Sequence, residues 1–276
     1  MTDIEKVQRY YRETDEWGRL DTPAGRLEFQ RTKAILQRHL HPESEILDLG
    51  GGPGRYTVFL AGLNHRVHLA DLSERQLQTA RSKIEAAGVT DRVLSIETAS
   101  ATDLSIYANA AFDAVACLGP FYHLTRADER TKAAREIARV LKSGGLGFVA
   151  FIPKLAGLAG LLLKAASDVE QVSPEGYLEI LRSGVFCNAT ARGWQEGYFF
   201  EEQELDDLLA AVGLSRIRTV SLRGIAFDRE TALDAIQEKS PALFEKIMRV
   251  ISQTEDDPRV IALGGHALYV GRKRTE

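Results

Sequence analysis

Short apolar runs alternate with longer helical patterns from about residue 44 of the chain onward. Runs rich in Val, Ile and Leu are typical of buried strands, whereas apolar residues that recur every three or four positions indicate amphipathic helices. This alternation predicts an α/β fold, a doubly wound seven-stranded sheet that is mostly parallel and has helices on both faces. The strands are expected at 45–49, 66–71, 93–98, 113–118, 147–152, 216–222 and 267–271.

Turn and capping residues mark where the predicted helices begin and end. Ser73-Glu74-Arg75-Gln76 is a capping-box pattern at the start of a helix that runs towards Gly88. A later helix runs through Ile137 and is expected to end at Ser143-Gly144-Gly145, where glycine can take a left-handed C-cap conformation. The next strand is therefore expected to follow that helix after a very short turn.

Two segments interrupt the alternation and are expected to cover one edge of the sheet as helical lids. In the first, Ile4, Val7 and Tyr11 share one face of a helical pattern. The second, 153–197, is far longer than the roughly two to six residues usual between a strand and a helix, so it is expected to fold as helices, at 155–166 and 174–181. The prediction is one domain over residues 1–276, with a core at 41–152 and 198–273 and a cap at 1–30 and 153–197.

A glycine-rich turn follows the first predicted strand, in the run Ile46-Leu47-Asp48-Leu49-Gly50-Gly51-Gly52-Pro53-Gly54. Glycine lets the backbone take a positive φ and approach a ligand with no Cβ in the way. Arg55 stands where a dinucleotide fingerprint counted from Gly50 would need its third glycine, which argues against a nicotinamide or flavin dinucleotide. The turn therefore predicts a binding site for a different cofactor.

An acidic residue stands at the end of the second predicted strand. Asp71 follows Gly50 by 21 positions, close to the roughly 20-residue spacing at which a carboxylate accepts the hydroxyls of a ribose. The alternative is a solvated carboxylate at a strand end. Because the turn and the acid occur together, we favour the ribose interpretation.

Four segments in the first half of the chain resemble, in the right order, the successive motifs of the class I S-adenosylmethionine (SAM) dependent methyltransferases. They are the run from Ile46 to Gly54, Ala70-Asp71-Leu72-Ser73, Ala101-Thr102-Asp103-Leu104 and Arg139-Val140-Leu141-Lys142-Ser143-Gly144-Gly145. The resemblance implies SAM as the cofactor and S-adenosylhomocysteine as its product. It also implies that the cofactor is bound by Asp48, Gly50, Gly51, Gly52, Asp71, Leu72, Ser100, Ala101, Thr102 and Leu118.

One departure from the family pattern concerns the adenine. Many relatives have Gly-Asp-Ala after the third strand, with the Asp bound to the adenine amino group, whereas this chain has Ala99-Ser100-Ala101. A neutral hydroxyl accepts a weaker hydrogen bond than a carboxylate does. Ser100 is therefore expected to make the weakest of the predicted cofactor contacts.

Candidate catalytic residues follow the fourth predicted strand, in Leu118-Gly119-Pro120-Phe121-Tyr122-His123-Leu124, at the edge where open α/β sheets bind ligands. His123, a group with an ordinary pKa near 6.5, is a candidate base, or else it packs under the loop and orients it. By resemblance, Tyr11 would point its hydroxyl at the reaction centre; the alternative for Tyr11 is packing. Tyr122 and Trp17 are candidates for an aromatic wall around the substrate, and the alternative for both is ordinary core.

The expected reaction is the transfer of a methyl group from SAM to an oxygen or nitrogen of a small molecule. The chain lacks the Asn/Asp-Pro-Pro-aromatic motif of base-amino methyltransferases, and neither Cys117 nor Cys187 follows a proline, as the nucleophile of cytosine C5 methyltransferases does. A net charge of −4 and a pI near 5.9 also disfavour a nucleic-acid partner. The alternatives are an RNA or protein methyltransferase, and a SAM-binding protein without catalysis.

Composition sets further limits. The chain has 276 residues, of which 44% are hydrophobic, enough to supply a sizeable core. Its longest apolar stretch, 155–166, is too short to span a bilayer, and the sequence begins without an apolar run like that of a signal peptide. A cytoplasmic protein without a membrane span is therefore expected.

The histidines and cysteines show no metal-ligand spacing, and no metal is expected. The sequence indicates no oligomeric state.

Overall fold

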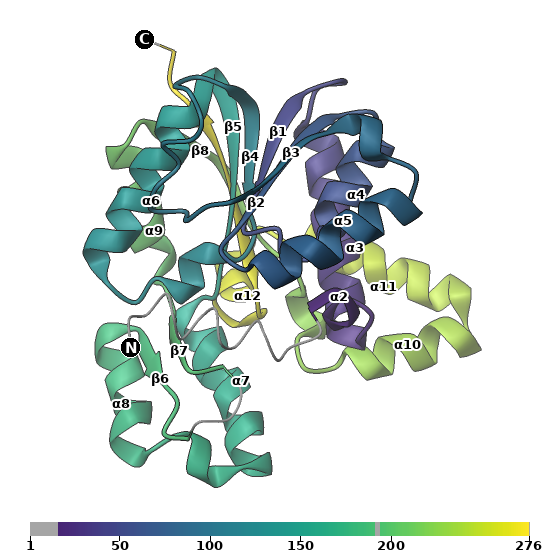
Figure 1. Cartoon of the computed structure of the whole chain (residues 1–276). Coiled ribbons are helices and arrows are strands. Elements are labelled where there is room, and N and C mark those ends of the chain that lie inside the picture. The colour runs from purple at the N-terminus through teal and green to yellow at the C-terminus, as the bar shows by residue number, and fades with distance from the viewer. Residues whose placement is uncertain (1–15, 191–193, 276) are drawn as a thin grey trace.

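The computed structural model describes residues 16–190 and 194–275 and contains a seven-stranded sheet (Figure 1). The strands lie in the order β3-β2-β1-β4-β5-β9-β8. Strand β9 runs antiparallel to both of its neighbours, and the remaining pairs are parallel. The predicted doubly wound, mostly parallel sheet is therefore confirmed. Its strands are β1 (Glu45–Leu49), β2 (Arg66–Asp71), β3 (Val93–Thr98), β4 (Phe112–Cys117), β5 (Leu141–Phe151), β8 (Leu214–Ser221) and β9 (Ala267–Lys273).

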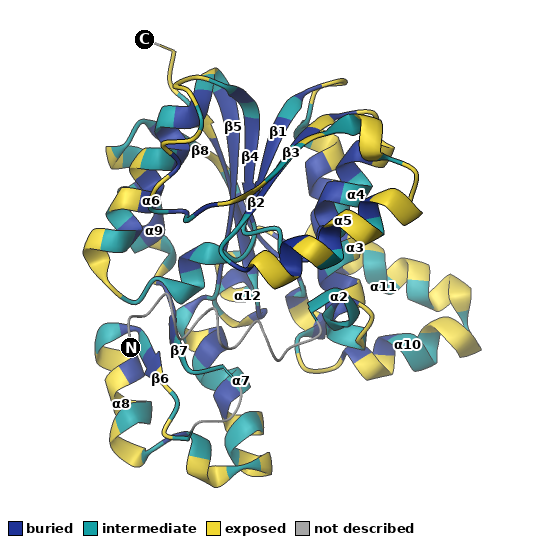
Figure 2. Ribbon diagram, viewed as in Figure 1, coloured by how far each residue is buried: buried dark blue, intermediate teal, exposed yellow. Residues whose placement is uncertain are grey.

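Helices cover both faces of the sheet. One face is covered by α3 (Pro23–His39), α4 (Arg55–Gly62) and α5 (Glu74–Ala86), and the other by α6 (Ala127–Val140) and α9 (Glu202–Ala211) (Figure 1). Side chains of each strand alternate between two apolar layers, because successive residues point to opposite faces. In β5, Phe148 belongs to the layer with Ile35 of α3, whereas Val149 belongs to the layer with Ile137 of α6. The central strands are accordingly buried on both sides (Figure 2).

The junction between α6 and β5 differs from the prediction. Helix α6 ends at Val140, and Leu141 is extended, with a ψ of 136°. The Leu141 side chain is fully buried and its backbone pairs with Phe112 of β4, so burial of this apolar residue ends the helix. Gly144 does have a positive φ of 76°, but it lies inside β5, which begins at Leu141 rather than at residue 147.

The strand order reverses between β1 and β4, because later strands are added on opposite sides of this pair. Ligands of open α/β sheets bind at such a reversal, beyond the carboxyl ends of the strands. Gly50 directly follows β1, and Leu118 directly follows β4. The glycine-rich turn and the predicted catalytic segment therefore meet at the same edge of the sheet.

Inserted segments surround this carboxyl edge. Helices α7 (Lys154–Ser167) and α8 (Pro174–Ser183) match those expected within 153–197. They pack with the two-stranded ribbon of β6 (Val185–Cys187) and β7 (Glu196–Tyr198) around an apolar cluster of their own (Figure 1). The ribbon was not expected, because three-residue strands leave no periodic pattern in a sequence.

The remaining elements are further helices and 3₁₀ turns. They are α2 (Glu16–Arg19), α10 (Glu230–Lys239), α11 (Pro241–Gln253), α12 (Pro258–Leu263) and the 3₁₀ turns η1 (Thr90–Arg92), η2 (Pro120–His123), η3 (Val169–Gln171) and η4 (Gly224–Ala226). Among these, α10 and α11 pack together with α3. Within residues 16–190 and 194–275, no helix combines the length and the apolar character needed to cross a bilayer.

A buried carboxylate ties α3 to the C-terminal part of the chain. Glu255, in the turn after α11, has a side chain that is only 2% exposed and forms an ion pair with Arg31 of α3. The Glu255 carboxylate also pairs with Arg38, with an N–O distance of 3.3 Å, and with Arg218 of β8, at 3.0 Å. Removing one partner of a buried ionic group leaves charge without compensation. The three guanidinium groups therefore depend on this carboxylate.

Glu255→Gln is expected to lower the free energy of unfolding by about 3 kcal/mol, because the buried guanidinium group of Arg31 loses its counter-charge. Asp256→Asn is the matched control, since Asp256 also pairs with Arg218, at 3.1 Å, but has a side chain that is 62% exposed. The control should cost less than about 1 kcal/mol. Urea unfolding followed by circular dichroism measures both, and equal losses would contradict the role given to Glu255.

Candidate functional site

A cavity opens beyond the carboxyl ends of β1, β2 and β4. With the open solvent at its mouth included, it encloses about 1160 Å³. Tyr122 and His123 line it. So do all of the residues predicted to bind the cofactor, namely Asp48, Gly50, Gly51, Gly52, Asp71, Leu72, Ser100, Ala101, Thr102 and Leu118.

Glycine is required at different positions of the turn for different physical reasons. A Cβ at Gly50 would lie 2.5 Å from the Pro120 ring, and a Cβ at Gly51 would lie 2.5 Å from a carboxylate oxygen of Asp48. These two glycines let the turn pack closely against its neighbours. Gly52 has a φ of 54°, and the nearest atom to a Cβ there would be Oδ2 of Asp71, 4.0 Å away. The space that a side chain at Gly52 would fill is open.

Asp48 is a buried acceptor with spare capacity. Its side chain is almost fully buried, and Oδ2 accepts a hydrogen bond of 2.7 Å from the Thr57 hydroxyl. Oδ1 has no hydrogen-bond partner among the described residues. Burial, together with the charge of Asp71, raises the pKa of Asp48 to about 6, against the opposing bond from Thr57. A buried oxygen without a donor is costly, so this position suits a ligand that brings a charged N–H group.

Asp71 holds the turn and faces the same cavity. Its Oδ2 accepts from the backbone N–H of Gly52 at 2.9 Å, and its Oδ1 accepts from that of Ser73 at 2.8 Å. Burial raises the pKa of Asp71, while these backbone bonds act in the opposite direction. Each carboxylate oxygen can accept a second hydrogen bond, so Asp71 is able to receive the two hydroxyls of a ribose.

The loop after β3 is held by its own hydroxyl groups. The Ser100 hydroxyl lies 2.8 Å from that of Thr102 and accepts a hydrogen bond of 3.2 Å from the Thr102 backbone N–H. The Ser100 hydroxyl thus uses part of its hydrogen-bonding capacity for contacts within the loop. An adenine amino group would find a neutral acceptor there that is already shared, in keeping with the weak contact expected from the sequence.

His123 packs against the segment that contains β7. Its Nδ1 accepts a hydrogen bond of 3.2 Å from the indole N–H of Trp194, so the neutral ring carries its hydrogen on Nε2. Burial, with the nearby charges of Arg19 and His266, lowers the pKa of His123 to about 3. An imidazole of this kind is a weak base at neutral pH. The geometry therefore argues for the orienting role of His123 rather than for the role of a base.

Tyr122 stands beside His123 as a neutral phenol. Its hydroxyl donates to the backbone oxygen of Leu118 at 3.3 Å, and burial raises its pKa well above the ordinary value. The other predicted wall residue, Trp17, is not among the residues that line the cavity. Its ring centroid lies 4.8 Å from the guanidinium carbon of Arg55 and 4.7 Å from the ammonium of Lys83. Tyr11 lies outside the described residues.

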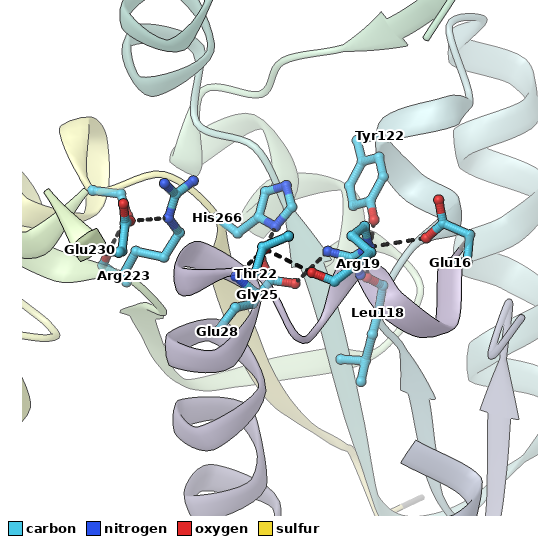
Figure 3. Close-up of polar contacts among 12 residues, drawn as sticks. Glu16, Arg19, Thr22, Gly25, Glu28, Leu118, Tyr122, Arg223, Glu230 and His266 are labelled. Carbon is cyan, nitrogen blue, oxygen red and sulfur yellow. Dashed lines mark hydrogen bonds and ion pairs between the residues drawn. The ribbon is translucent and has the colours of Figure 1, made fainter. Parts of the chain in front are cut away.

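Sequence reasoning missed a charged cluster beside the cavity (Figure 3). Arg19 and Glu16 of α2 line the cavity and form an ion pair with an N–O distance of 3.0 Å. Arg19 also pairs with Glu28 of α3 at 3.4 Å, and Glu28 accepts a hydrogen bond of 2.7 Å from Nδ1 of His266. Glu28 and His266 stand 238 positions apart, so no local pattern could have joined them. In the described part of the chain, no group of His, Cys, Asp and Glu has the arrangement of a metal site.

Three comparisons with known proteins agree with this site. Residues 46–145 match a family model described as a methyltransferase domain. Over 102 residues the chain is 35% identical to the methyltransferase GfsG of Streptomyces halstedii. This alignment covers 37% of this chain and 35% of that protein. Over 107 residues it is 36% identical to the ubiquinone/menaquinone biosynthesis C-methyltransferase UbiE of Vibrio cholerae, covering 38% of this chain and 39% of that protein. The matched part thus spans well under half of these relatives.

Solved structures share the fold over most of the chain. A SAM-dependent methyltransferase from Methanosarcina mazei aligns with a TM-score of 0.61 at 17% identity, over 88% of this chain and 98% of that one. A Burkholderia thailandensis 1,6-didemethyltoxoflavin-N1-methyltransferase with bound S-adenosylhomocysteine aligns with a TM-score of 0.59 at 19% identity, over 99% of this chain and 87% of that one. Residues 46–145 thus match a methyltransferase domain, and the chain has the fold of SAM-dependent methyltransferases around it.

Proposed function

We propose that the protein is an enzyme that transfers a methyl group from SAM to an oxygen or nitrogen of a small molecule. The carrying observation is the cavity in which the glycine-rich turn, Asp48 and Asp71 converge. The buried Oδ1 of Asp48 has no donor among the described residues, and the space beside Gly52 is open. Both features fit a ligand that joins an amino acid to a ribose.

The chain would hold each part of SAM with a different group. Asp48 would accept from the ammonium of the methionine part, and Asp71 would accept from the ribose hydroxyls. Arg19, a cation that lines the cavity, would bind the carboxylate of the methionine part. The loop from Ala99 to Thr102 would take the adenine. When bound, SAM supplies an electrophilic methyl group on a sulfonium.

The protein's main task in such a reaction is to align the reacting atoms and exclude water. Tyr122 and His123 line the cavity with ring centroids 4.9 Å apart, and the Trp194 ring lies behind His123, at 5.8 Å from it. Aromatic faces attract a cation such as a sulfonium. We propose that the segment from α7 to β7, which supplies Trp194, covers the methyl acceptor.

A small acceptor is favoured over a macromolecule. The net charge of −4 gives no general attraction to a phosphate backbone. The names of the relatives include a C-methyltransferase, an N-methyltransferase and an O-methyltransferase of small molecules, so they support the class of acceptor and leave its reacting atom to experiment. We keep oxygen or nitrogen as the proposed site of transfer.

Incubation of the purified protein with methyl-labelled SAM and a metabolite extract tests this function. A new labelled small molecule, together with S-adenosylhomocysteine, is the expected result. Label on added RNA or protein would establish a macromolecular acceptor instead. SAM retained by the protein with no labelled product of any kind would point to a binding protein without catalysis.

Asp71→Ala is expected to weaken S-adenosylhomocysteine binding by roughly 1 to 3 kcal/mol, because two ribose hydroxyls lose their buried acceptor. Isothermal titration calorimetry gives the affinity. Asp91→Ala is the control, since the Asp91 side chain is 78% exposed and lies outside the cavity. Unchanged affinity in Asp71→Ala would remove this residue from the site.

Affinity for S-adenosylhomocysteine is expected to rise with pH between 5 and 7. The pKa of Asp48 is about 6, so its carboxyl group is largely protonated at pH 5 and largely ionised at pH 7. Only the ionised form attracts the ligand's ammonium, which predicts a roughly tenfold smaller Kd at pH 7 than at pH 5. Calorimetry at both pH values should show this change, and Asp48→Asn should abolish it. A wild-type Kd that does not vary over this range would exclude the proposed contact.

A further inference from the structure

The proposed binding of SAM leaves one carboxylate of the cavity without a role. Among the described residues, the carboxylates that line the cavity are Glu16, Asp48, Asp71 and Glu129. Asp48 is proposed for the methionine ammonium and Asp71 for the ribose, and Glu16 forms an ion pair with Arg19 at 3.0 Å. Glu129 stands in the first turn of α6 and is partly buried. A carboxylate on the wall of a ligand cavity is a candidate for binding part of the ligand.

The face of α6 that carries Glu129 lies against the loop after β3. Residues three and seven positions apart share one face of a helix, and Lys132 and Glu136 follow Glu129 at these distances. Both line a hollow together with Thr102 of that loop. Glu136 also accepts a hydrogen bond of 2.6 Å from the backbone N–H of Leu104. This face of α6 and the loop are therefore in direct contact.

Thr102 connects this hollow with the main cavity, because it lines both. It also ends the loop from Ala99 to Thr102 that is proposed for the adenine. Glu129 lies one helical turn before Lys132, at the end of α6 that reaches the main cavity. Glu129 thus borders the part of the cavity in which the adenine would lie.

The start of α6 is held in place by the residue next to Glu129. Arg130 is 6% exposed and donates hydrogen bonds to the backbone oxygens of Leu124, at 2.9 Å, and Thr125, at 2.8 Å. Its guanidinium carbon lies 3.5 Å from the centroid of the Tyr198 ring. Glu129 is therefore carried by a backbone that is fixed on one side to the segment after η2 and on the other to β7.

The adenine amino group has two N–H donors, and the loop from Ala99 to Thr102 has few acceptors to spare for them. Its two side-chain hydroxyls, of Ser100 and Thr102, lie 2.8 Å apart and bond to each other. A carboxylate accepts a stronger hydrogen bond than a hydroxyl does. It also offers about four lone-pair positions, so Glu129 can accept from the amino group in addition to its other contacts.

We propose that Glu129 recognises the amino group of the adenine, and that α6 thereby supplies the carboxylate that the loop after β3 lacks. This inference rests on the proposed binding of SAM. It makes Glu129 a specificity-determining residue. A base with a hydrogen in place of the 6-amino group would leave the carboxylate without its donor, and a base with a 6-oxo group would present an acceptor to an acceptor.

The alternative partner for Glu129 is a cationic group on the methyl acceptor. In that case, removing the carboxylate would raise the KM for the acceptor and leave the affinity for S-adenosylhomocysteine unchanged. Binding measurements without any acceptor therefore distinguish the two partners.

Calorimetry with two ligands tests the proposal. One is S-adenosylhomocysteine, and the other is its analogue in which a hydrogen replaces the 6-amino group of the base. The wild type should bind the analogue about tenfold more weakly than S-adenosylhomocysteine. Glu129→Ala should bind S-adenosylhomocysteine about tenfold more weakly than the wild type does, and should bind the analogue within about twofold of the wild type. Glu129→Gln should lie between the two, because a neutral amide oxygen still accepts.

Glu175→Ala is the matched control. Glu175 occupies the first turn of α8, as Glu129 occupies that of α6, but it is exposed and does not line the cavity. This variant should keep the wild-type preference for the 6-amino ligand. Melting temperatures without ligand, together with binding of the analogue, show that each variant is folded.

The outcomes separate the two proposals. An equal loss of affinity for both ligands in Glu129→Ala would show an effect that does not pass through the amino group and would overturn the role of Glu129. Unchanged binding of S-adenosylhomocysteine, or a preference lost in Ser100→Ala and kept in Glu129→Ala, would overturn it as well. A wild-type protein that binds neither SAM nor S-adenosylhomocysteine would instead remove the proposed function itself.

Discussion

The candidate site depends on close packing of the glycine-rich turn where the strand order reverses, between β1 and β4. The turn after β1 has to leave the sheet, contact Pro120 of η2 after the neighbouring strand β4, and still leave open space at Gly52. Only residues without a side chain satisfy all three demands, since a Cβ at Gly50 or Gly51 would collide with its neighbours. The geometry of this turn fixes where Asp48 and Asp71 stand, because the Gly52 N–H is bound by Asp71 and Gly51 lies against Asp48.

Burial of charge is the second constraint, and the molecule handles it differently in different places. Glu255 forms ion pairs with three arginines and so connects α3 to the C-terminal part of the chain. Asp48 has no cationic partner of this kind among the described residues. Its Oδ1 has no hydrogen-bond donor there, and burial raises its pKa. Glu28 lies between these extremes, because it is shared by Arg19 and His266 at the border of the cavity. A buried carboxylate that is fully paired holds the fold together, whereas one left incomplete marks where a ligand is expected.

Local signals in the sequence were sufficient for the sheet and for the cofactor side of the site. Strands β1, β2 and β3 have the predicted bounds, and the residues predicted to bind the cofactor all line the cavity, where their roles stay predictions. Local signals failed where tertiary packing decides. Gly144 has the expected positive φ but does not end α6, because burial of Leu141 ends the helix earlier. The Trp17 ring contacts the cations of Arg55 and Lys83, and the pairing of Glu28 with His266 joins distant parts of the chain, so neither contact could be predicted from neighbouring residues.

Arg55, which excluded a dinucleotide fingerprint in the sequence, has a further consequence in three dimensions. As the first residue of α4 it continues the glycine-rich turn, and it binds the backbone oxygen of Trp17 at 3.3 Å and the carboxylate of Asp21 at 3.0 Å. The segment that carries Glu16 and Arg19 into the cavity is thereby anchored to the cofactor turn itself. Any excursion of α2 that widens the entrance must first break contacts made by the residue next to the cradle. The position of α2 beside the cavity is therefore coupled to the conformation of the glycine-rich turn.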